Sequence, residues 1–173
     1  EPGGENGPCA GCHMNAGESG HTFEVVEKDG SGVITEIKAI EVCNNCHFPS
    51  TYSDYWTEET LEEEAAGFAN ALTALDAEIA SARSGCSNSV DWTCPYPANP
   101  GNTLGAAFNS DMLADDPGAY AHNSLYARRL IFDSYDWMDN GIINGTIDLT
   151  GYTEAYEWMA GFPPPAITNV TRP

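Results

Sequence analysis

The feature that most constrains this chain is a short run, Cys-x-x-Cys-His, that occurs twice. It stands at residues 9–13 as CAGCH and at residues 43–47 as CNNCH. Two cysteines at this spacing can each form a thioether with a vinyl group of a haem, and the following histidine is then placed to bind the iron. One run alone also fits a zinc or redox site, but two runs with the same histidine indicate covalent haem attachment. We therefore expect two haem c groups, held by Cys9, Cys12, Cys43 and Cys46, with His13 and His47 as proximal iron ligands.

The histidine count predicts how the other side of each iron is filled. The chain has four histidines, so His21 and His122 remain once the two proximal ligands are assigned. Two irons each have one open axial position, and the match favours bis-histidine ligation at both. The alternatives are a surface residue for His21, a core histidine for His122, and Met112 as a competing ligand from an expected loop. His21 can reach its own haem or another one, and we interpret it as ligating a different haem.

The remaining cysteines and the overall charge bear on compartment and partners. Cys86 and Cys94 lie in a loop rich in Ser, Asn and Pro and are read as a disulfide, with two free thiols as the alternative. A disulfide beside thioether-linked haem points outside the cytoplasm, so we expect an exported chain whose signal peptide is already removed. The formal net charge of −20 argues against nucleic acid and anionic membrane surfaces as partners. No run is apolar enough to predict a membrane span.

Periodicity predicts a mainly α fold with a small β-hairpin and extensive irregular chain, organised around the haems. We expect a single dihaem domain over residues 1–173, with a haem-binding part at 1–50, a helical part at 54–141 and an extended C-terminal arm at 161–173. The first haem motif is expected on irregular backbone, and the hairpin to flank "KDGSG". Helices are predicted over 57–85, over 115–141 and around 153–161, with a long loop at 86–115.

The two long helices carry the more specific expectations. Thr57 is placed to cap the first, and an apolar stripe is predicted to face the core: Leu61, Ala65, Phe68, Leu72, Leu75 and Ile79. His122 is expected one turn into the second helix, which is predicted to end at Gly141. Arg128 and Arg129 follow, and either can hold a haem propionate or pair with a surface carboxylate. Asn144 and Asn169 stand in formal glycosylation sequons.

The paired motifs with their additional histidines resemble the multihaem c-type cytochromes. The stretch "DDPGAYAHNSLYARRLIFDSYDWMDNG" at 115–141 looks like a segment found in extracellular cytochromes of metal-reducing microbes, some of which polymerise into conductive filaments, or nanowires. In such proteins a histidine on a helix of this kind commonly supplies a distal ligand, and this role carries over to His122. The resemblance implies electron transfer rather than enzymatic catalysis.

These observations lead to one main expectation and two alternatives. We expect a bis-histidine dihaem cytochrome that is extracellular or at the cell surface and is the subunit of a filament. Its expected partners are identical subunits or other redox proteins, and it is expected to pass electrons to extracellular acceptors. A soluble periplasmic or secreted electron shuttle is the first alternative. A dihaem peroxidase is the second, and it requires a haem with an open or displaceable ligand.

Overall fold

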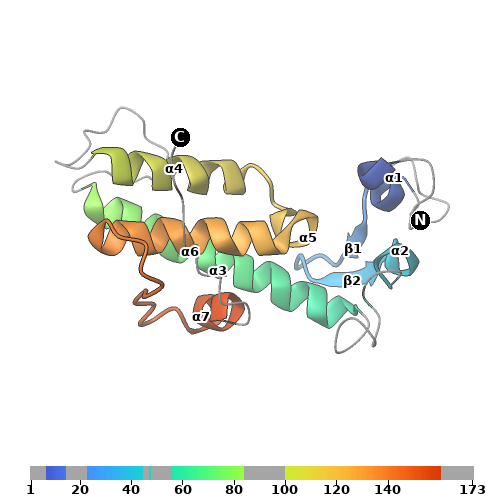
Figure 1. The fold of residues 1–173 in the computed structure, drawn as a ribbon. Coiled ribbons are helices and arrows are strands. Elements are labelled where there is room, and N and C mark those ends of the chain that lie inside the picture. The colour runs from blue at the N-terminus through green and yellow to red at the C-terminus, as the bar shows by residue number, and fades with distance from the viewer. Residues whose placement is uncertain (1–6, 15–22, 45–46, 48–55, 84–99, 161–173) are drawn as a thin grey trace. The chain divides into compact units, whose positions relative to one another are not determined.

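The computed structural model describes residues 7–14, 23–44, 47, 56–83 and 100–160. Contacts divide the chain into two compact units, residues 1–63 and 64–173, and the boundary falls within one long helix. The predicted mainly helical fold with one small hairpin is confirmed (Figure 1). The prediction of a single domain over residues 1–173, with its three parts, stays a prediction. Among the described residues, no helix is long and apolar enough to span a membrane.

The first unit is built from short elements. They are α1 (Gly7–His13), β1 (Val26–Lys28), β2 (Ile34–Ile37), α2 (Ile40–Asn44) and the start of α3 (Glu58–Ala82). The strands form the predicted antiparallel hairpin, in which Val26 pairs with Ile37 and a bulge follows Glu27. The Asp29 carboxylate accepts hydrogen bonds from the backbone N–H groups of Ser31 and Val33, which holds the turn closed.

Helix α3 begins and faces the core as the sequence predicts. Thr57 accepts a hydrogen bond from the Thr60 backbone N–H, and the Thr60 hydroxyl accepts one from the Thr57 N–H, so the two residues cap the helix reciprocally. The predicted apolar stripe is confirmed: Leu61, Phe68, Leu75 and Ile79 are buried, and Ala65 and Leu72 are partly buried. The helix therefore carries one continuous apolar face.

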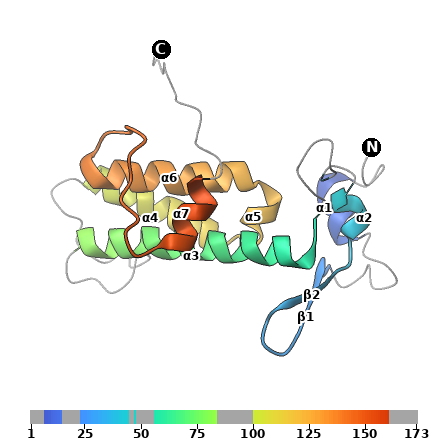
Figure 2. The same cartoon turned by 90° about the horizontal axis from the view of Figure 1, so that it is seen from below.

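In the described part of the second unit, helices pack around one hydrophobic core. The rest of α3 is joined by α4 (Pro100–Ala114), α6 (Ser124–Asn140) and α7 (Thr153–Ala160), with the short α5 (Ala119–His122) before α6. Figures 1 and 2 show α3 and α6 running in one direction and α4 in the other. The core includes Phe68, Leu75, Ile79, Ala106, Ala107, Leu113, Ile131, Tyr135, Leu149, Trp158 and Met159.

Trp158 of α7 packs directly on α3. A Cβ atom at Gly67 would lie 2.6 Å from the Trp158 Cβ, so the absence of a side chain at Gly67 allows this close approach. The Trp158 Nε1–H donates to Glu64 Oε2 over 2.8 Å, and the Arg128 guanidinium lies 4.7 Å from the indole centroid. Three elements of the second unit thus meet around one indole.

The predicted loop over 86–115 is wrong for its second half, because residues 100–114 form α4. Its buried side is made mostly of small or polar residues, including Thr103, Ala106 and Ser110, with the large apolar Leu113 near its end. Two other large apolar residues, Leu104 and Phe108, are exposed. A buried face of this composition has no stripe of large apolar residues, and so it lacks the pattern that predicts α3.

The helix predicted over 115–141 is interrupted. Asn123 has φ −159° and ψ 73°, which ends α5 at His122, and its side chain accepts a hydrogen bond from the Tyr126 N–H to cap α6. The expectation that His122 lies one turn inside a long helix is therefore corrected: it is the last residue of α5. The predicted end at Gly141 is confirmed, with φ 75° in the left-handed region.

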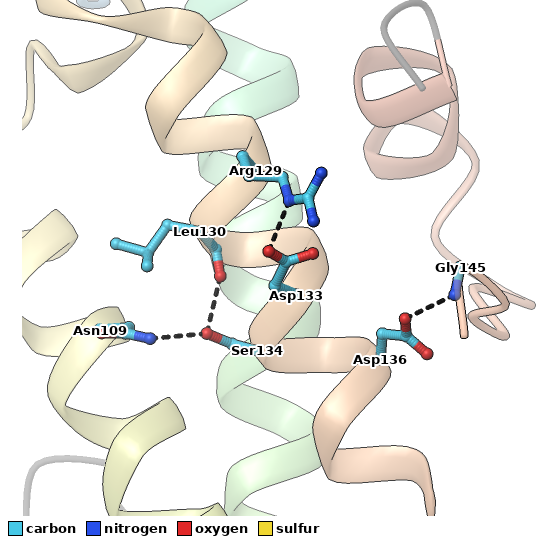
Figure 3. A network of polar contacts seen from close by, with 7 residues as sticks. All are labelled: Asn109, Arg129, Leu130, Asp133, Ser134, Asp136 and Gly145. Atoms are coloured by element: carbon cyan, nitrogen blue, oxygen red, sulfur yellow. Dashed lines mark hydrogen bonds and ion pairs between the residues drawn. The ribbon is translucent and has the colours of Figure 1, made fainter. Parts of the chain in front are cut away.

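Side chains of α6 link it to its neighbours (Figure 3). The Asn109 amide of α4 donates to the Ser134 hydroxyl over 2.9 Å, and that hydroxyl donates to the Leu130 carbonyl. Asp136 is fully buried, and its Oδ2 accepts from the Gly145 N–H over 2.7 Å. These bonds hold α4 and the 141–152 connection against α6.

Candidate haem-binding site

The first motif is helical, which corrects the expectation of irregular backbone. Cys9 and Cys12 lie three positions apart in α1, so their side chains share one side of the helix. Both are thiols outside any disulfide; Cys9 is exposed and Cys12 half-buried. His13 is the last residue of α1. One short helix therefore presents both thiols and ends on the imidazole, as attachment to two adjacent vinyl groups requires.

Phe23 contacts the His13 imidazole both through its backbone carbonyl and through its ring. The Nδ1 atom lies 2.7 Å from the Phe23 carbonyl oxygen, and the two rings are stacked with centroids 4.6 Å apart and planes 14° apart. A carbonyl oxygen only accepts, so Nδ1 donates this hydrogen bond and the neutral ring carries its lone pair on Nε2. This is the tautomer in which Nε2 can bind a metal.

Phe23 has a backbone conformation that is unusual for its type. Its φ of 64° is the only positive value at a non-glycine residue in the described ranges. The left-handed region costs an L-residue of this kind about 1–2 kcal/mol, and such strain concentrates at functional sites. Here the strained residue is the one whose carbonyl and ring both contact His13. The strain is thus located where the imidazole is held.

The second motif resembles the first, with a cysteine on a helix, α2, and a histidine beside an aromatic ring. Cys43 lies in the last turn of α2, and the His47 N–H donates to the Cys43 carbonyl over 2.9 Å. The His47 ring meets Trp56 edge-on at 4.7 Å. Asn44, inside the motif, accepts a hydrogen bond from the Trp56 backbone N–H over 3.1 Å. A residue within the motif therefore holds the backbone of Trp56, whose ring contacts the histidine of the same motif.

The two motif-bearing helices are neighbours. Within the first unit α1 and α2 contact each other, although the hairpin lies between them in the sequence. Both views show the two helices next to each other (Figures 1 and 2). Donor groups that would hold two haems are consequently gathered in one small unit.

His122 lies outside that unit, at the end of α5 in residues 64–173. Its side chain is 55% exposed, which argues against the alternative that His122 is a buried core residue. Its Nδ1 atom lies 2.8 Å from Asp116 Oδ1 and 3.1 Å from Oδ2. The competing ligand candidate Met112 is on α4 rather than in a loop, and is exposed.

The two arginines suggested as propionate contacts have protein partners. Arg128 is 6% exposed, and its Nη2 donates to both Glu64 carboxylate oxygens, at 2.5 and 2.6 Å. The Arg129 Nε donates to Asp133, one turn further along α6 (Figure 3). These pairs correspond to the alternative that the sequence allows, in which an arginine pairs with a carboxylate of the protein. A propionate contact stays a prediction for both.

Several predicted residues lie outside the described residues. They are His21, Cys46, the suggested disulfide partners Cys86 and Cys94, Asn169 and the arm at 161–173. Asn144 is described and exposed. Conversely, sequence reasoning missed Phe23, Asn44, Trp56 and Asp116. For Asp116 the "DPG" turn six residues before His122 was a usable signal, whereas no local pattern marks Phe23 as a partner of His13.

The donor chemistry fits covalently held haem. In the first motif two thiols share one side of a helix, and the adjacent imidazole is hydrogen-bonded through Nδ1 to a backbone carbonyl. Metal-binding histidines commonly have this hydrogen bond, which fixes the ring and directs the other nitrogen to the metal. In the second motif a hydrogen bond joins the His47 N–H to the Cys43 carbonyl.

Comparisons with known proteins agree with this donor chemistry. Over 83% of its length the chain is similar to C-type polyheme cytochrome OmcC of Geobacter sulfurreducens, with 37% identical residues. It is similar over the same share to OmcB from two strains of that species, at 36% identity. The chain spans 22% of the length of each of these relatives. No family model and no solved structure matches it.

Proposed function

We propose that this chain, a relative of the polyheme c-type cytochromes, transfers electrons through two covalently bound haem c groups. The resemblance drawn from its paired motifs is confirmed by the curated relatives, whose names describe polyheme c-type cytochromes. A bound haem supplies an iron that is reduced and oxidised by one electron. The observation that carries the proposal is the contact between α1 and α2, which gathers the two motifs in one unit.

Each motif has a defined task in this proposal. Cys9 and Cys12 form the thioethers of one haem, and Cys43 and Cys46 those of the other. His13 and His47 bind the two irons through Nε2. For His13 the support is its hydrogen bond to the Phe23 carbonyl, which leaves the Nε2 lone pair directed away from that bond.

His21 and His122 are proposed as the distal ligands. For His122 the support is its exposure and the hydrogen bond of its Nδ1 atom to Asp116, an arrangement typical of metal-binding histidines. Ligation of both irons by two histidines saturates them, and such a site passes electrons and binds small molecules poorly. This favours electron transfer over peroxidase chemistry.

Haem content tests the attachment sites. The chain is expressed with a signal peptide in a host that matures c-type cytochromes, and haem is counted by intact mass and by the pyridine haemochrome spectrum. The parent is expected to carry two haems, and the double variant Cys9→Ala/Cys12→Ala only one. As a matched control, Cys86→Ala/Cys94→Ala is expected to retain both. Loss of haem from the control, or an unchanged count in the first variant, would contradict the assignment.

Spin state tests the distal ligands. His122→Ala and His21→Ala are each expected to convert one haem from low spin to high spin in the electron paramagnetic resonance (EPR) and absorption spectra. Met112→Leu is the control and is expected to stay low spin. A high-spin parent with peroxide turnover would favour the enzyme and overturn the bis-histidine proposal.

We further propose that the protein works outside the cell as the subunit of a conductive filament, with Cys86 and Cys94 joined in a disulfide. The cytochrome relatives and the resemblance of the segment at 115–141 support this proposal. The charge of −20 favours the other candidate, a soluble secreted or periplasmic carrier, because copies of the chain repel one another. Electron microscopy of the secreted protein at low and high salt decides: filaments support the first, and discrete particles at both salts support the second.

A further inference from the structure

The segment from Asp116 to His122 forms a closed hydrogen-bonded loop. Asp116 Oδ1 accepts from the Gly118 N–H over 3.2 Å and from His122 Nδ1 over 2.8 Å. The His122 N–H in turn donates to the Gly118 carbonyl over 2.8 Å. A carboxylate accepts, so the neutral imidazole donates through Nδ1 and carries its lone pair on Nε2. The segment therefore sets the tautomer of its own histidine.

Gly118 is needed in this loop for space rather than for backbone freedom. Its φ of −99° is accessible to any residue. A Cβ atom at this position, however, would lie 2.8 Å from Cε1 and 3.0 Å from Nε2 of the His122 ring. The imidazole thus rests directly on the bare Cα of Gly118, and this contact limits how the ring can rotate.

Stability does not explain the hydrogen bond between Asp116 and His122. The two side chains are 44% and 55% exposed, and exposed pairs of this kind contribute little to folding. The bond nevertheless engages both carboxylate oxygens. This exposed histidine is held in one tautomer by a carboxylate, and its ring packs against a glycine that limits its rotation.

We propose that Asp116 is a positioning residue that tunes the haem ligated by His122. Its carboxylate makes the imidazole a stronger donor to a metal at Nε2, and a stronger donor stabilises the oxidised iron over the reduced iron. The reduction potential of that haem is lowered as a result. Gly118 fixes the ring orientation in the same site. The inference rests on the proposed ligation by His122.

Asp116→Asn tests the proposal in the full haem-loaded chain. Asparagine keeps an acceptor oxygen for Nδ1 and removes the charge. The matched control is Asp115→Asn, which removes the same charge from an exposed neighbour whose side chain has no hydrogen bond. Both are measured by spectroelectrochemical titration at constant pH, with far-UV circular dichroism to confirm folding.

We expect Asp116→Asn to raise one of the two midpoint potentials by about 59 mV relative to Asp115→Asn. This shift corresponds to a tenfold change in the equilibrium between oxidised and reduced haem for one electron. The other haem is expected to keep its potential. Equal shifts in the two variants would show that only the general field of the protein changed, and would overturn the proposal.

Two further variants separate this inference from the proposed function. If His122→Ala leaves both haems low spin, the ligation is wrong and the tuning role is lost with it. If His122→Ala makes one haem high spin while Asp116→Asn leaves the potential at the control value, only the tuning role fails. Gly118→Ala is expected to change the EPR g-values of the haem that His122 ligates, and Gly105→Ala to leave them unchanged. The absence of any difference between these two would overturn the role of Gly118.

Discussion

Replacing Gly67 by alanine tests how closely α7 is held against α3. The added Cβ would lie 2.5 Å from Cδ1 and 2.6 Å from Cβ of Trp158, far inside van der Waals contact. The indole has little freedom to move, because its Nε1–H is bonded to Glu64 and its face lies beside Arg128. Gly67→Ala must therefore displace either the helix or a side chain with several fixed partners.

The magnitude follows from two opposed effects. Overpacking in a core destabilises by about 1–3 kcal/mol. Alanine in place of glycine within a helix stabilises by about 1 kcal/mol. Gly105→Ala, in α4, has the second effect alone, since nothing lies within 4 Å of its added Cβ. The two variants should differ by about 1–3 kcal/mol, and with about 2–4 °C per kcal/mol for a chain of this size, the melting temperatures should differ by several degrees.

Thermal unfolding of the haem-loaded variants, followed by circular dichroism, measures this difference. Gly67→Ala is expected to unfold below the parent and Gly105→Ala above it. In a Trp158→Leu background the gap between the two alanine variants is expected to shrink, because the clashing group is gone. A Gly67→Ala protein that unfolds at or above the temperature of Gly105→Ala would refute the reasoning.

Three other substitutions address separate parts of the structure. Glu64→Gln removes the charge that faces a buried arginine, and we expect the free energy of unfolding in urea to fall by about 2–3 kcal/mol. This is less than for a fully buried pair, because Glu64 is partly exposed. An unchanged urea midpoint would show that the pair does not contribute to stability. Phe23→Gly relieves the left-handed strain but removes the ring stacked on the first proximal histidine, so the EPR signal of that haem should change while the melting temperature does not fall. Hydrogen bonds from the hydroxyl and backbone N–H of Thr150 lower the pKa of Asp148 below its ordinary value of 3.8. The lowered pKa stabilises the folded protein above pH 3.8, and this stabilisation is lost as pH falls through the folded-state pKa of Asp148. Thr150→Val should therefore be less stable than the parent near neutral pH and equal to it in strong acid. A difference in stability of the same size at both pH values would contradict this linkage.

The contrast between α3 and α4 shows what sequence pattern can predict in this fold. In α3 large apolar residues lie on the buried face, and a threonine starts the helix, so the pattern and the packing coincide. In α4 the buried face is made of residues such as Ala106 and Ser110, while Leu104 and Phe108 face outward. Tertiary packing against α6 selects that face, and a local pattern does not reveal such a choice.

The candidate site divides in a similar way. The cysteines and proximal histidines follow from covalent chemistry that fixes their spacing, so the sequence alone predicts them. The residues that orient the imidazoles do not share a spacing. Phe23 acts through its backbone carbonyl, which any residue possesses, and only its left-handed conformation reveals the role. The break at Asn123, which makes His122 the end of a helix, likewise depends on one backbone conformation.

The hairpin between the two motifs has a practical consequence. Val26 at its entry pairs with Ile37 at its exit, and the Lys38 N–H donates to the Val25 carbonyl. The chain therefore leaves the hairpin beside the point where it enters. The hairpin residues lengthen the chain between the two motifs without moving the two ends of the hairpin apart. A peptide inserted at the exposed turn near Gly30 would leave both ends in place. That turn therefore offers an attachment point for an affinity tag or for linkage to an electrode. Attachment there is expected to preserve the separation of the two motifs.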